Sequence, residues 1–259
     1  MLESFPIVRI KDQQKEVIDD LVVREIPLTI NIGENELVTL LCCPSDLEDL
    51  VRGFLFSSGL IKKAEDIIKI LINREQWIAY VSLVGGEIDQ SLVFKRLYTS
   101  GCGRGTMFYN VSDILNRSKV VSDFKISVEK INELVFDFQK RSALYLKTGG
   151  VHGAALATDQ GISIFKEDIG RHNAIDKVIG NALKEHIDFI DKIIISSGRI
   201  SSEVLLKTQK CRIPVVISKS APTDQAVKLA KDMGITLIGF ARGKRMNIYN
   251  QEERVIIGE

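Results

Sequence analysis

One of the four cysteines lies in a short segment of small and polar residues. The run Ser100-Gly101-Cys102-Gly103-Arg104 places the thiol of Cys102 between two glycines, with a guanidinium two positions later. Glycine lets another molecule approach the backbone closely, and a nearby cation favours the nucleophilic thiolate. The segment therefore indicates a reactive thiol that a large partner can reach. A glycine-rich turn around a buried, inert cysteine is the alternative.

The other three cysteines show no pattern of a reactive or metal-binding site. Cys42 and Cys43 are neighbours, and Cys211 precedes an apolar segment, so we expect all three in or near the core. The spacings contain no CxxC pair and no zinc-ligand pattern, so no protein-bound metal is expected. Unpaired cysteines are typical of a reducing compartment, which indicates a cytoplasmic protein.

Length and charge exclude several classes of protein. The chain has 259 residues, of which 45% are hydrophobic and 27% charged, and its formal net charge is +1. These values are typical of a globular protein and provide no large field that would attract nucleic acid or a membrane. The N-terminal residues lack a signal-peptide pattern, and no apolar run approaches a membrane span. A site that binds an anion must therefore owe its positive charge to a few neighbouring residues rather than to the overall charge of the protein.

The first part of the chain, residues 1–118, is predicted to be a small α+β unit that ends in the Cys102 loop. Alternating apolar residues predict strands, and an apolar stripe after Pro44 predicts a helix with Ser45 as its N-cap. Residues 84–117 carry little periodic signal, so we interpret them as a linker and functional loop. The predicted strands cover residues 28–32, 36–41, 67–72 and 77–83.

Residues 119–259 predict an α/β domain. A helical stripe begins near residue 128, and a hairpin turn joins two short strands at residues 159–161. Continuous apolar strands then alternate with helices, an order that predicts a mixed, mostly parallel sheet with right-handed crossovers. The predicted elements are strands at 154–158 and 162–166, a helix at 173–186, a strand at 192–196, a helix at 202–210, a strand at 214–218, a helix at 224–233 and a strand at 235–240.

Polar, glycine-marked segments follow three of these strands, at 196–201, 218–223 and 240–245. Ligands of α/β sheets bind beyond the carboxyl ends of the strands, and helix N-termini with serine hydroxyls suit phosphate. Three such loops at one edge favour an anionic, nucleotide-like ligand over simple helix caps. The residues that could supply positive charge are Arg199, Lys219, Arg242, Lys244 and Arg245.

Two further clusters contain histidine. Asp168, Arg171 and His172 lie in one loop before a helix, where they could tune a proton or form a structural ion pair. His152 lies between Gly150 and Gly153, which suggests a close approach to its backbone, although a lone histidine is more often a structural hydrogen-bonding residue.

The order of these segments along the chain resembles that of the FdhD/NarQ family of formate dehydrogenase accessory sulfurtransferases. The resemblance covers nearly the whole chain, and its longest motif is the run from Glu167 to Lys177. The matching segments are Pro44 to Leu50 with Gly53-Phe54-Leu55, Ser100-Gly101-Cys102-Gly103, Gly149-Gly150-Val151-His152, Glu167 to Lys177, Ser197-Gly198-Arg199, Ser220-Ala221-Pro222-Thr223 and Gly239-Phe240-Ala241-Arg242.

The resemblance implies a sulfur carrier. A cysteine desulfurase would hand persulfide sulfur to Cys102, which would pass it to the molybdenum (or tungsten) bis-guanine-dinucleotide cofactor of formate dehydrogenase. It also implies a homodimer and a cytidine-deaminase-like three-layer α/β/α domain beside the smaller N-terminal unit. The residues expected to bind the cofactor are Phe240, Ala241, Arg242, Gly243, Lys244, Arg245, Ser197, Arg199, Ser220, Thr223, His152 and His172.

The sequence departs from the family at one position. Many relatives carry CxxC in the loop, whereas here Gly105 replaces the second cysteine, so no disulfide can form within the loop. A cofactor-binding chaperone without sulfur chemistry is the alternative function. A metal-dependent nucleobase hydrolase is a third hypothesis, but the glutamate of H-x-E and the P-C-x-x-C motif of zinc deaminases are both missing.

Overall fold

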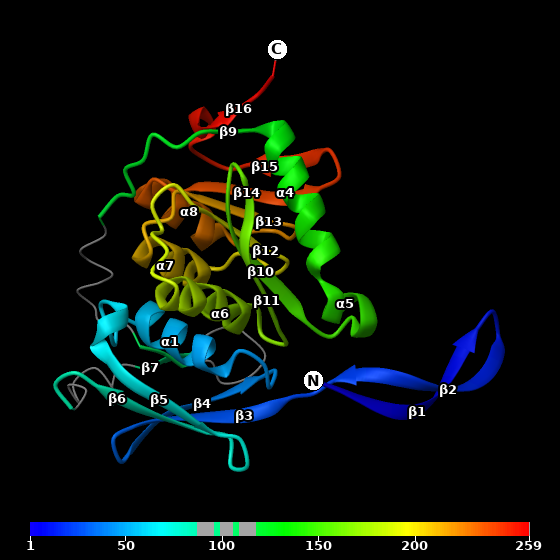
Figure 1. The fold of residues 1–259 in the computed structure, drawn as a ribbon. Helices are drawn as coiled ribbons and strands as arrows, with labels where there is room; N and C mark the ends of the chain where they lie inside the picture. Colours follow the sequence, from blue (N-terminus) through cyan, green and yellow to red (C-terminus); the bar gives the residue numbers. More distant parts are fainter. Residues whose placement is uncertain (87–95, 99–105, 109–117, 259) are drawn as a thin grey trace.

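A six-stranded sheet forms the centre of the molecule (Figure 1). The computed structural model describes residues 1–86, 96–98, 106–108 and 118–258. The strand order is β11-β10-β12-β13-β14-β15. The bounds are His152–Thr158 for β10, Gly161–Asp168 for β11, Ile193–Ser196 for β12, Val215–Ser218 for β13, Thr236–Arg242 for β14 and Arg245–Ile248 for β15.

The sheet is mixed, as predicted. Strands β12, β13 and β14 are parallel because helices connect them, and crossover helices are what parallel strands require. Tight turns join β10 to β11 and β14 to β15, so these pairs are antiparallel, as is β10 against β12. The parallel part of the sheet is therefore confined to β12, β13 and β14, and the prediction that the sheet is mostly parallel is wrong, because three of its five strand pairs are antiparallel.

Helices cover both faces of this sheet and produce the three layers expected (Figure 1). Helix α4 (Val128–Arg141) covers one face, where Phe138 packs with Ala155 and Ile195. The other face is covered by α6 (Arg171–Lys184), α7 (Ser202–Lys210) and α8 (Asp224–Met233). Adjacent residues of one strand point to opposite faces, so Ile194 packs among the helices of this second layer.

A second, four-stranded sheet lies beyond helix α1 (Leu47–Ser57), in the order β4-β3-β6-β5. Helix α1 packs on α6, and two glycines allow the close approach. A Cβ atom on Gly53 would lie 1.8 Å from the backbone oxygen of Asp176, and one on Gly180 would lie 1.8 Å from that of Asp49. The strand bounds are Ile26–Ile32 for β3, Asn35–Cys42 for β4, Ile67–Asn73 for β5 and Ile78–Leu83 for β6.

The predicted cap of α1 is wrong by one residue. The N-cap is Asp46, at φ 50°, and its side chain does not cap the helix. Instead one carboxylate oxygen of Asp46 accepts a hydrogen bond from Nζ of Lys166 at 2.6 Å, and Asp49 accepts another from the same amine at 2.8 Å. The start of α1 is therefore tied to β11 by an ion pair rather than by a side-chain cap.

Other elements were not expected from the sequence. Strands β1 (Leu2–Lys11) and β2 (Gln14–Val23) form a hairpin that runs away from the body (Figure 1). Helix α5 (Ala143–Thr148) follows α4 directly. Within the predicted loop 84–117, two short strands pair in antiparallel fashion, with Tyr98 opposite Thr106. The remaining elements are η1 (Ala64–Asp66), β7 (Arg96–Tyr98), β8 (Thr106–Phe108), β9 (Ile126–Ser127), η2 (Glu252–Arg254) and β16 (Val255–Ile256).

One cluster of buried side chains includes residues of both predicted units. Leu50 and Leu55 of α1 share it with Ile175 and Ile179 of α6. The division of the chain at residues 118 and 119 stays a prediction.

Candidate functional site

A cavity of about 620 Å³ opens at the carboxyl edge of the three parallel strands. Ligand binding was expected at this edge, because parallel strands end there together. The residues that line the cavity are Phe138, Gln139, Ser142, Tyr145, Gly149, Gly150, Val151, His152, Gly153, Ile169, Ser197, Lys219, Arg242 and Gly243.

Each parallel strand contributes one polar residue to the cavity. Ser197 follows β12, Lys219 follows β13, and Arg242 is the last residue of β14. The β14–β15 ladder shifts register between Gly239 and Arg242, and Phe240 within this bulge adopts a φ of 52°. A bulge redirects the side chains that follow it, so this irregularity determines where the guanidinium of Arg242 is placed.

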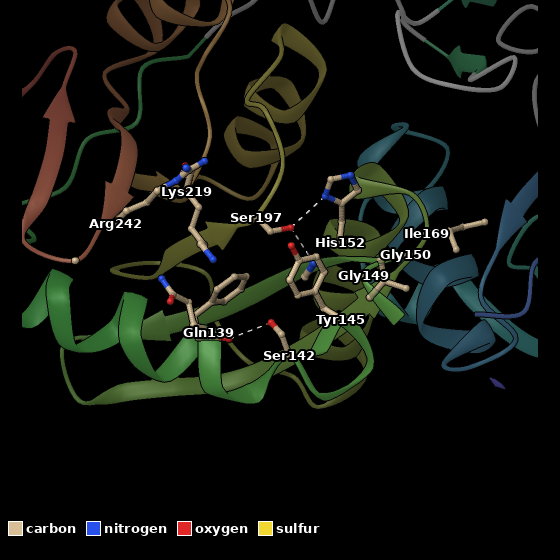
Figure 2. A pocket seen from close by; sticks show the side chains of 14 residues that line it. Gln139, Ser142, Tyr145, Gly149, Gly150, His152, Ile169, Ser197, Lys219 and Arg242 are labelled. Carbon is tan, nitrogen blue, oxygen red and sulfur yellow. Dashed lines mark hydrogen bonds between the residues drawn. The ribbon is translucent and has the colours of Figure 1, made fainter. Parts of the chain in front are cut away.

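Two cations, Lys219 and Arg242, form one side of the cavity (Figure 2). The Nε of Arg242 donates a hydrogen bond to the backbone oxygen of Lys219 at 2.9 Å, which joins the two strand ends. Burial, and then the positive charge of Arg242, lower the pKa of Lys219 below its ordinary value. An anion bound between the two side chains would relieve this repulsion, and arginine can contact a phosphate through two N–H groups.

His152 and Ser197 lie on the opposite side (Figure 2). The hydroxyl oxygen of Ser197 accepts the backbone N–H of Gly153 at 3.0 Å and lies 3.1 Å from Nδ1 of His152. Burial lowers the pKa of His152, and the charge of Arg171 lowers it further. His152 is therefore neutral near pH 7, with one ring nitrogen as a hydrogen-bond donor and the other as an acceptor.

An aromatic and glycine-rich wall completes the cavity. Tyr145 lies on α5, whose first turn is fixed because the carboxylate of Glu167 accepts the backbone N–H groups of Leu144 and Tyr145, both at 3.0 Å. Gly149 ends this helix at φ 66° and, with Gly150, leaves open backbone beside the cavity. A half-exposed aromatic ring next to accessible backbone is suited to a flat, polar ligand such as a nucleobase.

Part of the predicted cofactor-binding set meets at this cavity, namely His152, Ser197, Arg242 and Gly243. The other predicted residues do not line it. Ala241 is buried in the core, and the hydroxyl of Thr223 accepts the N–H of Ala226 as the cap of α8. The binding roles of the whole set stay predictions. The residues outside the lining are Phe240, Ala241, Lys244, Arg245, Arg199, Ser220, Thr223 and His172.

His172 does not line the cavity, and its side chain is 17% exposed. Its Nδ1 lies 3.3 Å from a carboxylate oxygen of Glu203. Burial, followed by the charges of Lys207 and Arg171, lowers the pKa of His172 to about 2. Burial raises the pKa of Glu203. The imidazole is therefore neutral throughout the physiological range.

Asp168 forms a buried ion pair. Its carboxylate lies 2.6 Å from Nζ of Lys177, and neither side chain is exposed. It also accepts hydrogen bonds from the backbone of Cys43 at 3.0 Å, from the backbone of Gly170 at 2.9 Å and from the amide of Asn173 at 2.9 Å. These contacts tie β11 and α6 to the end of β4, beside Ile169, which lines the cavity.

Three cysteines are buried and free, as predicted. Burial raises the pKa of Cys42 to about 12 and that of Cys43 to about 11, and the charge of Asp168 adds to both shifts. Burial raises the pKa of Cys211 as well. None of these thiols is suited to nucleophilic chemistry near neutral pH. Cys102, the predicted nucleophile, lies outside the described residues.

Sequence reasoning did not find Phe138, Gln139, Ser142 and Tyr145 as cavity residues. Phe138 was predicted only as part of the apolar stripe of a helix. Tyr145 was missed because its helix, α5, has only six residues and is too short to show a helical period. Within the described ranges no group of three His, Cys, Asp or Glu side chains could hold a metal ion. No helix of those ranges is long and apolar enough to cross a membrane.

Comparisons with known proteins agree on one family. The model of the FdhD/NarQ family matches residues 23–256. The chain is 43% identical to a sulfur carrier protein FdhD of Bacillus subtilis over 239 residues, 92% of this chain and 91% of the relative. It is 40% identical to one of Staphylococcus aureus over 257 residues, 98% of this chain and 96% of the relative.

A solved structure shows the same fold. A crystal structure from Desulfotalea psychrophila, assigned as a formate dehydrogenase accessory protein, superposes with a TM-score of 0.79 at 26% identity. The superposition covers 98% of this chain and 99% of the other.

Proposed function

The chain belongs to the FdhD/NarQ family, and from this we propose that it is a sulfur carrier that serves formate dehydrogenase. In this proposal Cys102 accepts persulfide sulfur from a cysteine desulfurase. The sulfur then passes to the molybdenum (or tungsten) bis-guanine-dinucleotide cofactor, which is the bound substrate. The observation that carries the proposal is the cavity at the sheet edge, where Lys219 and Arg242 face Tyr145 and His152.

The sulfur-carrying role falls to Cys102 because the alternatives are chemically poor. The three other thiols are buried, and their raised pKa values keep them protonated. Cys102 has glycine on both sides and Arg104 two positions later, which favours access and the thiolate. In the loading step this thiolate attacks the outer sulfur of the desulfurase persulfide. The sulfur–sulfur bond of the donor breaks, and the donor cysteine leaves as a thiolate.

The cavity residues suit a guanine dinucleotide. A volume of about 620 Å³ lies within the range of about 300 to 1,000 Å³ that small-molecule sites occupy. Lys219 and Arg242 would hold the phosphates, and the ring of Tyr145 would stack on the base. His152 is neutral, so it would donate a hydrogen bond to the ligand but would add no positive charge to the site. The chain's role toward the cofactor is therefore to bind and orient it.

A first experiment tests the loading of Cys102. The protein is incubated with a cysteine desulfurase and cysteine, and intact mass and peptide masses are recorded. The proposal expects one added sulfur atom on the peptide that contains Cys102 and none after Cys102→Ala. Cys43→Ala is the matched control, because it removes a buried thiol and should leave loading unchanged. Equal loading of the protein and the Cys102→Ala variant would reject the sulfur-carrier role.

A second experiment tests the cavity with guanosine diphosphate as the probe. Calorimetric titration should show that Arg242→Ala weakens binding about tenfold or more, since a charged hydrogen bond contributes about 1.5 to 3 kcal/mol. Lys231→Ala is the control, because Lys231 is an exposed cation of α8 that belongs neither to the cavity lining nor to the predicted binding set. Binding that is equally sensitive to both changes, or to neither, would place the nucleotide elsewhere.

The two experiments also separate the alternative function. A chaperone that holds the cofactor without sulfur transfer would bind the nucleotide through Arg242 yet gain no sulfur on Cys102. Association with a cysteine desulfurase and formate dehydrogenase and a cytoplasmic location belong to the proposal. Free cysteines support the reducing location.

A further inference from the structure

The longest motif of the sequence begins with two acidic residues, Glu167 and Asp168, whose side chains contact different elements. Adjacent residues of one strand point to opposite faces of a sheet. Asp168 pairs with Lys177 of α6 at 2.6 Å, whereas the carboxylate of Glu167 contacts α5. Glu167 does not line the cavity, but in the β10–β11 ladder it lies directly opposite Gly153, which does. The role of the Glu167 side chain is therefore separate from the buried ion pair of its neighbour.

Helix α5 is too short to be stable by itself. It has six residues, of which only Leu144 is buried, and isolated helices shorter than about 12 to 15 residues are marginal in water. Ser142 is the N-cap residue, but its side chain does not cap the helix. Its hydroxyl donates instead to the backbone oxygen of Phe138 at 3.3 Å. The first backbone N–H groups of α5 therefore have no local side-chain acceptor.

Glu167 supplies the missing acceptor from another strand. One of its carboxylate oxygens accepts the N–H of Leu144 and the other accepts that of Tyr145, both at 3.0 Å. These are the N–H groups that an N-cap side chain normally takes, and a negative charge near a helix N-terminus is stabilising. The backbone oxygen of Glu167 in turn accepts a hydrogen bond from Nζ of Lys177 at 3.3 Å. The start of α5 is therefore tied to β11 through this carboxylate.

The segment that Glu167 holds forms much of the cavity wall. Five of the 14 lining residues fall between Ser142 and Val151, and Tyr145 is the aromatic residue among these five (Figure 2). Tyr145 is 50% exposed, so packing alone does not fix the position of its ring. One of the two N–H groups bound by Glu167 belongs to Tyr145 itself, so a shift of this contact moves the ring with the backbone.

We propose that Glu167 is a positioning residue for the bound nucleobase. Its carboxylate holds the first turn of α5, and thereby the ring of Tyr145, at the place where a guanine base can stack. The inference rests on the proposed function, because it concerns the same cavity. It goes further by assigning a role in base binding to a carboxylate that does not touch the ligand, while Lys219 and Arg242 hold the phosphates.

A double-mutant cycle tests whether Glu167 acts through Tyr145. Guanosine diphosphate is the probe, and calorimetric titration measures its affinity for the wild type, Glu167→Ala, Tyr145→Ala and the double variant. Removing an aromatic ring that stacks on a base should weaken binding about tenfold, and Glu167→Ala is expected to approach this loss. The double variant should bind no more weakly than Tyr145→Ala, because the ring that Glu167 positions is already absent. Additive losses, or wild-type affinity of Glu167→Ala, would overturn the proposal.

Two further variants separate positioning from a general loss of structure. Glu167→Gln keeps an oxygen that can accept one of the two N–H groups, so it should lose less affinity than Glu167→Ala, and the reverse order would contradict the proposal. Glu129→Ala is the matched control, since Glu129 is an exposed glutamate in the first turn of α4 and does not line the cavity. It should bind the probe like the wild type, and a loss as large as that of Glu167→Ala would reject the specific role of Glu167.

Hydrogen exchange of the ligand-free protein tests the contact itself. In Glu167→Ala the amides of Leu144 and Tyr145 should exchange with deuterium faster than in the wild type, because they lose their acceptor. Unchanged exchange would show that the carboxylate does not hold α5. Failure of the proposed function gives a different result. A wild-type protein that binds no guanosine diphosphate, or binds it equally well after Arg242→Ala, would reject that function, and this inference with it, even where the amides exchange as expected.

Discussion

His172 should make the protein sensitive to acid, and the size of the effect follows from its surroundings. The side chain is largely buried beside Glu203, and the positive charges of Lys207 and Arg171 disfavour a further cation. Its pKa falls from 6.5 to about 2 in the folded protein. Below pH 6.5, His172 binds a proton in the unfolded chain but not in the folded protein. Stability from this residue is therefore complete above pH 6.5 and decreases as the pH falls.

The expected loss at pH 5 is about 2 kcal/mol, since the pH then lies 1.5 units below the unfolded pKa of 6.5 and each unit corresponds to about 1.4 kcal/mol. His172→Gln keeps a side chain of similar polarity but cannot take up this proton. The neighbouring Glu203 has a raised pKa and changes stability in the opposite direction, but it is present in both proteins.

Urea unfolding at pH 7 and pH 5 measures the effect. The wild-type free energy of unfolding should fall between the two pH values by about 2 kcal/mol more than that of His172→Gln. Equal pH dependence in the two proteins would refute the buried, neutral state of this histidine.

Three further predictions concern other contacts. Gly53→Ala should destabilise the protein by about 3 kcal/mol or more in urea unfolding, because the new Cβ atom would lie 1.8 Å from the backbone oxygen of Asp176; wild-type stability would show that α1 and α6 do not cross so closely. Lys177→Met should cost about 3 to 5 kcal/mol by leaving Asp168 charged and buried, and adding Asp168→Asn should recover part of the loss; no recovery would contradict the ion pair. Binding of guanosine diphosphate should weaken as the pH rises, and at a lower pH than an ordinary lysine would require, because burial and the charge of Arg242 lower the pKa of Lys219; calorimetry of Lys219→Met should show that this pH dependence is lost.

The alternation of strands and helices was sufficient to predict five of the six strands of the main sheet, whereas β15, which follows the predicted loop 240–245, was not predicted. Residues 193–195 form a continuous apolar run because both faces of their strand are buried, and such a run is a clear signal of a central strand. The hairpin of β1 and β2 was not predicted, because most of its apolar side chains are exposed and its strands contain Pro6 and many charges. Its two strands pair only with each other and not with either larger sheet, so their residues do not show the apolar pattern of a buried strand.

The candidate site was partly predictable for a physical reason. Parallel strands end at one edge, so Ser197, Lys219 and Arg242 could be placed together from the strand order alone. One of the two interpretations of the loop paired Asp168 with Arg171, whereas the ion pair in the structure is with Lys177, six residues further along α6. Which cation reaches a buried carboxylate depends on the direction in which the helix leaves the strand. That direction cannot be predicted from the spacing of charged residues in the sequence.

The transfer of sulfur from one cysteine to a cofactor is the central claim. The protein is loaded with ³⁵S through a cysteine desulfurase, freed of the donor, and mixed with the guanine-dinucleotide cofactor and a thiol reductant, since release of persulfide sulfur as sulfide takes two electrons. The account predicts that the label leaves the Cys102 peptide and appears on the cofactor, and that Cys102→Ala delivers none. Label that stays on the protein, or reaches the cofactor equally well from Cys102→Ala, would contradict it.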